Sequence, residues 1–284
     1  MPVGLDANIE AALGQAPLST LPLCGGCVSK VYRLAMPDGS EVVAKLGGTE
    51  SGLGLEGWML RYLRKNSNLP VPTVLHESDE LLVTEYIPNE GGIDRSAQIN
   101  AADLLAALHD VTTSTYGLER DTLIGGLHQP NPQSTEWLPF FCNHRLLHMG
   151  RQSLAASRMP KSLMTRLESF CARLGEFLEE PAAPSLIHGD MWAGNILCTS
   201  GRIAGFVDPA IYYADPEIEL AFSTLFGTFG DPFFSRYQEH RPLKPGFAEA
   251  RRDIYNLYPL LVHVRLFGGS YVGSVSATLS RFGG

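Results

Sequence analysis

The segment SLIHGDMWAGNILCTSGRIAGFVDPAIYYADPE, from Ser185 to Glu217, determines the architecture predicted for the whole chain. An apolar run leads into Asp190, which opens a D-x-x-x-x-N motif that closes at Asn195. A second apolar run, residues 201–207, ends at Asp208. Two short strands of this kind would bring the three polar side chains to one point. By itself the segment also fits a metal-hydrolase loop or an ordinary strand–turn–strand unit, so other parts of the chain must distinguish these readings.

Composition is typical of a soluble globular enzyme with one large domain or two lobes. The 284 residues are 44% apolar and 18% charged, with a net charge of -8 and a pI of about 5.5. Such an acidic chain has no general attraction for nucleic acid or anionic membranes. His263 and Arg265 interrupt the most apolar late stretch, and the first residues do not read as a signal peptide. We therefore expect a cytoplasmic protein with reduced thiols, since its five cysteines are odd in number and scattered.

Periodicity divides the chain into a β-rich beginning and a helical remainder. Two strand-like runs flank Pro37-Asp38-Gly39, a hairpin signal, and residues 54–65 show helical spacing. Two more strands are expected at residues 71–78 and 81–87. Helices are expected within residues 96–111, 135–150, 162–180, 217–226 and 251–267. The predicted fold is α+β and bilobal: a small β-rich lobe with one main helix at 1–87, a hinge about 85–90, and a larger mainly helical lobe at 88–284.

Lys45 and Glu56 form the first candidate functional pair. Lys45 ends the strand EVVAK, where a lone lysine is usually solvated. Glu56 lies on the same helical face as Leu60 and Leu63, and a charge on an apolar face needs a partner. The pair would hold Lys45 extended toward nucleotide phosphates.

Two backbone segments complete a candidate nucleotide site. Gly25 and Gly26 would let backbone N–H groups approach phosphate, although the full G-x-G-x-x-G pattern and a Walker A loop are both absent. The stretch around Glu85, Tyr86 and Ile87 would offer the Glu85 carbonyl and the Ile87 N–H to adenine. The alternative for this second stretch is a plain interdomain linker.

The order of these parts matches the arrangement that kinases use for phosphoryl transfer. Asp190 would orient the acceptor hydroxyl and accept its proton, and the oxygens of Asn195 and Asp208 suit Mg²⁺. Taken singly, each of the three could equally cap a turn or satisfy loop backbone. Together with Lys45 and Glu56 they favour a kinase.

The motifs HGDMWAGN, DPAIYYADPEIELA, RPLKPGF and LYPLLVHVRLFGGSY resemble those of the fructosamine kinase (ketosamine 3-kinase) family. That family belongs to the aminoglycoside-phosphotransferase-like group with a protein-kinase-like fold. The resemblance implies use of ATP and Mg²⁺ to phosphorylate the 3-hydroxyl of ketosamines. These are fructosamine, ribulosamine or erythrulosamine adducts of amines or protein lysines, and the unstable product falls apart, which removes the glycation. Carried over by motif, Asp190 is the base, Asn195 and Asp208 hold Mg²⁺, and Trp192 contacts the sugar.

Several further residues carry expectations with open alternatives. Tyr212 could bind substrate or pack, and Asp215 and Glu217 could attract the ketosamine nitrogen or start the next helix. Glu219 stands where the family usually has Asp, an acid expected to hydrogen-bond the catalytic-loop backbone. Cys27, inside the glycine turn, is a candidate redox-sensitive thiol, with a turn-packing role as the alternative.

Three other functions compete with a ketosamine kinase. The first is a related kinase of aminoglycosides, choline or another hydroxyl compound, since substrate pockets drift on a shared fold. The second is a non-catalytic nucleotide-binding module, against which the presence of Lys45 and the Asp residues argues. The third is a metal-dependent hydrolase, which leaves Lys45 and Glu56 unexplained. The expected partners are ketosamine small molecules or glycated protein lysines, and the expected state is a monomer or weak homodimer.

Overall fold

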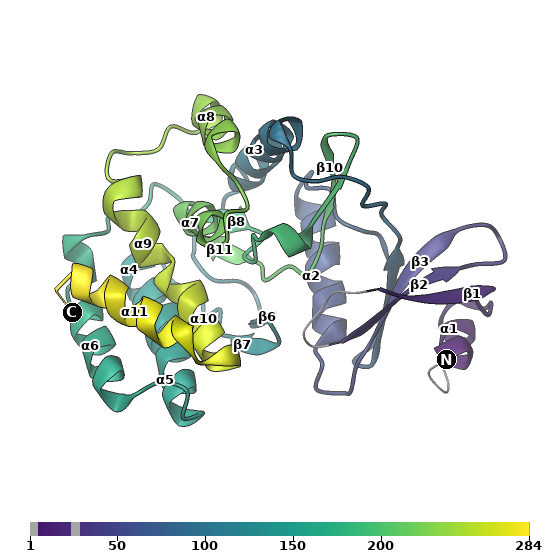
Figure 1. Cartoon of the computed structure of the whole chain (residues 1–284), viewed down its shortest axis with the longest axis horizontal. Helices are drawn as coiled ribbons and strands as arrows, with labels where there is room; N and C mark the ends of the chain where they lie inside the picture. Colours follow the sequence, from purple (N-terminus) through teal and green to yellow (C-terminus); the bar gives the residue numbers. More distant parts are fainter. Residues whose placement is uncertain (1–4, 24–28, 284) are drawn as a thin grey trace.

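A five-stranded antiparallel sheet occupies one end of the molecule in the computed structural model, which describes residues 5–23 and 29–283 (Figure 1). The strand order is β1-β2-β3-β5-β4. Its strands are β1 Ser19–Leu23, β2 Lys30–Ala35, β3 Glu41–Leu46, β4 Val74–Glu77 and β5 Leu81–Glu85. The predicted hairpin between β2 and β3 is confirmed, with Lys30 opposite Leu46 and Ala35 opposite Glu41.

Two helices cover the two faces of this sheet. Helix α1, Leu5–Leu13, buries Leu5 and Ile9 in a small core with Leu34, Val42 and Val83. Helix α2, Leu53–Asn66, contributes to the main core and packs on β4 and β5. The side chains of β5 alternate between the two cores, because successive residues of a strand point to opposite faces. Helix α2 is the predicted main helix; α1 and β1 were not predicted.

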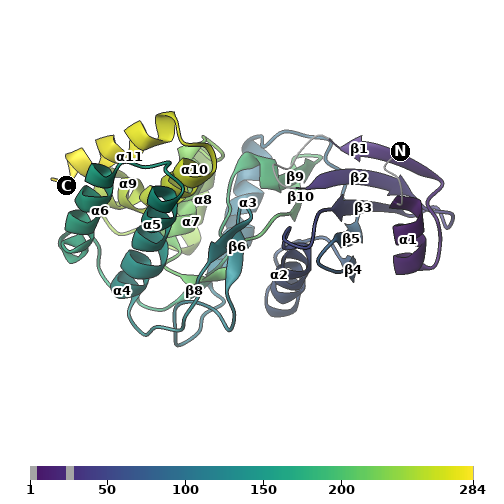
Figure 2. The ribbon, with the colours of Figure 1, turned by 90° about the horizontal axis from the view of Figure 1, so that it is seen from below.

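The other end of the molecule is mainly helical (Figures 1 and 2). Its α-helices are α3 Arg95–His109, α4 Trp137–Phe141, α5 His148–Ala155, α6 Lys161–Cys171, α7 Glu217–Leu225, α8 Asp231–His240, α9 Arg252–Tyr255, α10 Leu257–Phe267 and α11 Ser270–Arg281. Two π-helical segments, Cys142–Leu147 and Phe247–Arg251, lead into α5 and α9. The helices expected from periodicity are therefore present, and α8 and α11 are additional.

Three two-stranded units lie among these helices. They are β6 Thr122–Ile124 with β7 Leu127–Gln129, β8 Ser185–Ile187 with β11 Tyr212–Ala214, and β9 Ile196–Thr199 with β10 Arg202–Phe206. The last unit includes β10, the strand expected within residues 201–207. Among the described residues, no helix is long and apolar enough to cross a membrane. The boundary between residues 87 and 88 stays a prediction.

Candidate active site

Lys45 joins two acidic side chains from distant parts of the chain. Its Nζ lies 2.6 Å from Glu56 Oε1 and also contacts Asp208 Oδ1. Lys45 lies on strand β3 and Glu56 lies in the first turn of α2. Asp208 is the second residue after the end of β10. The ion pair expected between Lys45 and Glu56 is therefore present, and the structure adds Asp208 to it.

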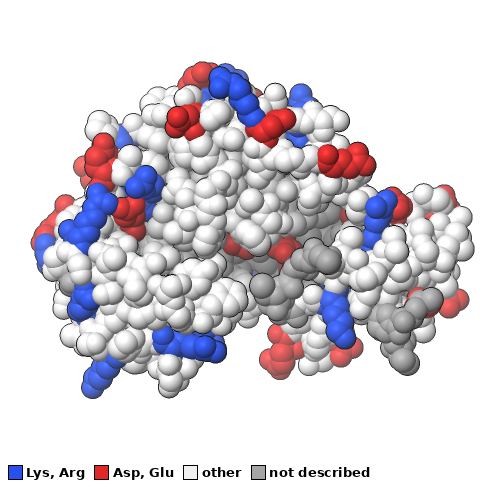
Figure 3. Space-filling model, in the orientation of Figure 1, with Lys and Arg blue, Asp and Glu red and all other residues white. Residues whose placement is uncertain are grey.

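The charges of this trio depend on one another. Burial by itself lowers the pKa of the Lys45 ammonium, but Glu56 and Asp208 outweigh that effect and raise it. Burial likewise opposes ionisation of Asp208, yet the attraction of Lys45 leaves the pKa of Asp208 below its usual value. Lys45 is thus a fixed cation held by two acids. Figure 3 shows acidic side chains at the bottom of the hollow near the middle of the molecule.

The loop that carries Asp190 depends on a glycine. Strand β8 pairs with β11 up to Ile187 opposite Tyr212, and the Ala210 N–H then donates to His188 O at 2.8 Å. Gly189 follows with a φ of 86°, a left-handed conformation that favours glycine. A Cβ at this position would lie 2.1 Å from Ala210 O, so any side chain would displace the loop.

A buried network holds the same loop from below. Glu219 Oε1 accepts a hydrogen bond from the Gly189 N–H at 2.7 Å, and Glu219 Oε2 lies 2.9 Å from His109 Nε2. The other nitrogen of His109 lies 2.8 Å from the Tyr237 hydroxyl. The expected contact between the acid at 219 and the catalytic-loop backbone is confirmed. His188, fully buried, has a pKa lowered by burial, which suits a structural histidine better than a proton carrier.

Asp190 and Asn195 are brought together at the opening of this loop. Asn195 Nδ2 donates to Asp190 Oδ2 at 2.8 Å and to Asp190 O at 2.9 Å. Burial raises the pKa of Asp190 to about 7, against the hydrogen bond from Asn195, which lowers it. A carboxylate with this pKa is suited to accept a proton near neutral pH.

The residues predicted to bind Mg²⁺ fit that ion. Asn195 Nδ2 lies 3.5 Å from Asp208 O, so the two residues share one corner of the site. Within the described part of the chain, no residue donates a hydrogen bond to Asn195 Oδ1. Mg²⁺ takes oxygen ligands and is commonly held by one or two carboxylates plus substrate phosphates and water. Residues 5–23 and 29–283 contain no cluster of three or more His, Cys, Asp or Glu side chains suited to a metal, which is compatible with a site that phosphates and water complete.

The sheet pairing of β5 stops in the segment that was predicted to bind adenine. The Tyr86 N–H donates to Glu41 O at 3.1 Å, and this is the last hydrogen bond between β3 and the segment that follows β5. Ile87 comes next, and no acceptor for its N–H exists among residues 5–23 and 29–283. Thr84, near the end of β5, is buried. Gly25, Gly26 and Cys27 lie outside the described residues.

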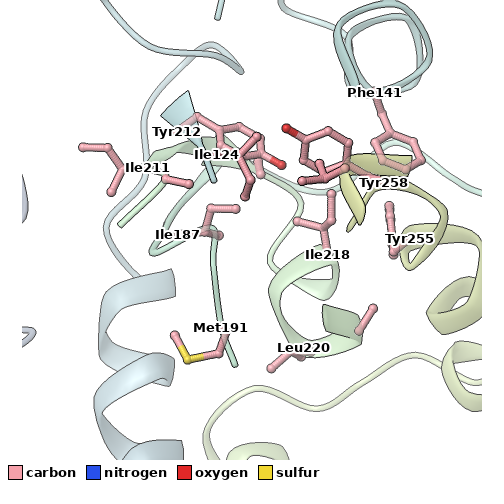
Figure 4. Close-up of a cluster of buried hydrophobic side chains, with 14 of the residues drawn as sticks. Ile124, Phe141, Ile187, Met191, Ile211, Tyr212, Ile218, Leu220, Tyr255 and Tyr258 are labelled. Carbon is pink, nitrogen blue, oxygen red and sulfur yellow. The ribbon is translucent and has the colours of Figure 1, made fainter. Parts of the chain in front are cut away.

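Trp192 remains accessible, whereas Tyr212 does not. The Trp192 side chain is 43% exposed, and its ring covers Gly194 so closely that a Cβ there would lie 2.2 Å from it. Tyr212 is 1% exposed, and its ring stacks on the Arg145 guanidinium at 3.8 Å. Figure 4 shows Tyr212 among buried side chains that include Ile124 and Tyr258. The substrate-binding role predicted for Tyr212 is therefore wrong, and its packing alternative is correct.

Asp215 and Glu217 are engaged within the protein. Asp215 is buried, with Oδ2 accepting from the Tyr255 hydroxyl at 2.5 Å and Oδ1 accepting from the Glu217 N–H at 2.9 Å. Glu217 forms two hydrogen bonds with Arg251, at 2.6 and 2.8 Å. The structure therefore corrects the substrate roles predicted for both residues. Asp215 fits the alternative, a start signal for α7, and Arg251 neutralises Glu217.

Two buried residues of the network around Glu219 were missed from the sequence. His109 and Tyr237 look like ordinary residues of amphipathic helices, and no local pattern marks them as partners of Glu219. Arg145 is also fully buried, and its guanidinium donates to Asn131 Oδ1 at 2.6 Å.

Comparison with known proteins assigns this chain to a family. The family model described as fructosamine kinase matches residues 6–282. The chain belongs to the fructosamine kinase family. It is 31% identical over 268 residues to the "Probable ketoamine kinase" of Vibrio parahaemolyticus, covering 91% of this chain and 90% of that protein. It is 30% identical over 301 residues to the chloroplastic "Protein-ribulosamine 3-kinase" of Oryza sativa subsp. japonica, covering 97% of this chain and 86% of that protein.

Solved structures confirm the predicted fold of this fructosamine kinase family member. A "putative fructosamine-3-kinase" from Thermobifida fusca superposes with a TM-score of 0.84 at 27% identity, covering 97% of this chain and 98% of that one. Aminoglycoside phosphotransferase APH(4)-Ia, in a ternary complex with ADP and hygromycin B, superposes with a TM-score of 0.71 at 16% identity, covering 99% and 100%. The second likeness shows the fold alone. The chain is a phosphotransferase with the α+β, bilobal protein-kinase-like fold predicted from its sequence.

Proposed function

We propose that this enzyme transfers the γ-phosphoryl group of ATP to the 3-hydroxyl of a ketosamine, as the first step of deglycation. The observation that carries the proposal is the convergence on one site of the cation Lys45, its acids Glu56 and Asp208, and the paired Asp190 and Asn195. Family membership favours a ketosamine acceptor over the aminoglycoside or choline alternative, since the relatives' names specify ketoamine and protein-ribulosamine kinases.

Each side chain has a defined task in this transfer. The acceptor oxygen attacks the γ-phosphorus, the bond from that phosphorus to the β-phosphate oxygen breaks, and ADP leaves. Asp190 orients the acceptor hydroxyl and accepts its proton, for which a pKa of about 7 is suitable. Lys45 neutralises phosphate oxygens, and the backbone at Glu85–Ile87 binds adenine. Gly25 and Gly26 complete the phosphate site in this proposal.

The oxygens of Asn195 and Asp208 would hold Mg²⁺, which when bound neutralises charge on the phosphate oxygens. Trp192 would present its exposed face to the C–H groups of the sugar. A cytoplasmic location, a monomeric or weakly dimeric state, and free or protein-bound lysine adducts as substrates are parts of the same proposal.

An ATP-consumption screen tests the proposal directly. The panel contains ribulosyl-, erythrulosyl- and fructosyl-lysine beside aminoglycosides and choline. We expect turnover with at least one ketosamine and none with the other acceptors; phosphate transfer only to an aminoglycoside or choline would overturn the substrate assignment. Asp190→Asn should abolish turnover while ATP binding is retained, and a variant with full activity would remove Asp190 as the base.

A further inference from the structure

The β6–β7 hairpin was not predicted from the sequence, and the proposed reaction assigns it no role. Thr122 pairs with Gln129 and Ile124 with Leu127. The turn consists of Gly125 and Gly126, whose φ values of 54° and 78° match the two-residue turns preferred in tight hairpins. The hairpin lies between the helical part of the molecule and α2 (Figure 2).

One side of the hairpin is bonded to the segment that follows Asp208. Gln129 Nε2 donates to Ala210 O at 3.0 Å, and Thr122 Oγ1 donates to Ile211 O at 3.3 Å. Both Thr122 and Gln129 are fully buried. The hairpin is therefore tied to the backbone two and three residues beyond the predicted metal ligand.

Further buried bonds make this attachment rigid. The Tyr258 hydroxyl donates to Gln129 Oε1 at 2.7 Å, and Asn131 Nδ2 donates to Thr122 Oγ1 at 2.8 Å. Ile124 is 3% exposed and lies beside Tyr212 in the core (Figure 4). Shifting the hairpin would leave several buried polar groups without partners, which is costly.

The opposite side of the hairpin contacts the start of α2. Leu123 packs on Gly52, where a Cβ would lie 2.1 Å from Leu123 Cδ1. Gly52 precedes α2, and its carbonyl accepts the Glu56 N–H at 2.9 Å. The Arg120 guanidinium lies 4.9 Å from the Trp58 ring centroid, a second contact with the same helix. The helical turn that carries Glu56 is thus held against the hairpin.

We propose that the β6–β7 hairpin is a positioning element that sets the separation between Glu56 and Asp208, with Leu123 and Gln129 as its positioning residues. Glu56 and Asp208 belong to different parts of the molecule, yet both must reach Lys45 Nζ. A spacer that is bonded to the Asp208 segment and packed on the Glu56 turn keeps both acids within reach of Lys45. The inference rests on the proposed function of Lys45 as the phosphate-binding cation.

Leu123→Ala tests the side of the hairpin that faces α2. Leu123 is only partly buried, so the melting temperature should change little. The apparent KM for ATP should rise and kcat should fall, so that kcat/KM for ATP decreases by about tenfold. Leu123→Met, which keeps the contact, should behave as the wild type. The matched control is His128→Ala on the same hairpin, because its side chain is 57% exposed and its partners among the described residues are Asp121 and the ring of His148.

A double-mutant cycle separates positioning through Glu56 from general loosening. MgATP binding to the full chain is measured by titration calorimetry for the wild type, Leu123→Ala, Glu56→Gln and the double variant. The Leu123→Ala effect should disappear in the Glu56→Gln background. Wild-type kinetics in Leu123→Ala, or the same loss in both backgrounds, would overturn the inference. MgATP binding is read without a ketosamine, so failure of the proposed acceptor would not obscure this result.

Discussion

Glu219 Oε1 accepts the Gly189 N–H at 2.7 Å, which ties helix α7 to the loop that carries Asp190. The family resemblance implies aspartate at this position, and the longer side chain of Glu219 still reaches the loop. Its second oxygen is held by His109 at 2.9 Å. Glu219 thus fixes the catalytic loop relative to helix α7 and His109.

Replacing Glu219 with Ala should damage both stability and catalysis. The change leaves the Gly189 N–H and the buried His109 Nε2 without a partner, at about 1–3 kcal/mol for each group. We expect loss of about 3 kcal/mol in urea unfolding and a large drop in kcat. Glu219→Gln keeps an acceptor for Gly189 and should retain more activity. Glu239→Gln, at a surface acid 61% exposed, is the control, and equal losses in both Glu219 variants would contradict the hydrogen-bond explanation.

Gly189→Ala should inactivate the enzyme because the new Cβ would lie 2.1 Å from Ala210 O. Gly201→Ala is a matched control, since Gly201 also has a positive φ of 71° but a Cβ there would meet its nearest neighbour at 3.4 Å. The control should lose about 1 kcal/mol of stability from backbone strain and keep its kcat. Single-turnover rates of the two variants make the comparison, and an active Gly189→Ala would show that the loop geometry is not required.

Trp192→Ala should raise the KM for the ketosamine by about tenfold and leave the KM for ATP unchanged. Trp192 is 43% exposed, so its removal should not lower the melting temperature. Trp192→Phe keeps a flat ring and should restore much of the affinity. Steady-state kinetics with each substrate varied separately provide the measurement. An unchanged ketosamine KM in Trp192→Ala would exclude the ring from the acceptor site.

Asn195→Ala should increase the Mg²⁺ concentration needed for half-maximal activity by about tenfold or more, since it removes one of the two protein oxygens proposed for the ion. EDTA should abolish transfer in the wild type, and added Mg²⁺ should restore it. Activity titrated against free Mg²⁺ gives the comparison. The same Mg²⁺ dependence in variant and wild type would remove Asn195 from the ligand set.

Asp215 should make stability depend on pH. Burial raises the pKa of Asp215 from an ordinary 3.8 to about 6, so the folded protein favours the neutral acid. The resulting contribution to stability is complete below pH 4 and is lost as pH rises through 6. Relative to Asp215→Asn, the wild type should lose about 2–3 kcal/mol over this range.

Urea unfolding of both proteins at several pH values between 3.5 and 7.5 checks this sign. Subtraction removes the titrations that the two proteins share. A difference in the free energy of unfolding that stays constant with pH, or that grows in favour of the wild type, would contradict the raised pKa.

Several helices and strands could be predicted from local sequence patterns, such as turn residues and the spacing of apolar side chains. The Pro37-Asp38-Gly39 turn predicted the β2–β3 hairpin, and the apolar face around Leu60 and Leu63 predicted α2. The Gly125-Gly126 pair between apolar residues carried a hairpin signal of the same kind, which was overlooked. The pairing of β8 with β11 could not be predicted from single short runs, because it joins residues far apart in the chain.

Three features could be inferred without the folded structure: the fold class, the family resemblance, and the kinase order of Lys45, Glu56, Asp190, Asn195 and Asp208. These depend on residue type, spacing and period, which are local properties. Packing in the folded chain then established which side chains remain free to bind substrate. It buried Tyr212 against Arg145, paired Glu217 with Arg251, and placed His109 behind Glu219. Burial and pairing depend on packing between distant segments, so residues that look equally polar or aromatic in the sequence acquire different roles only in the folded chain.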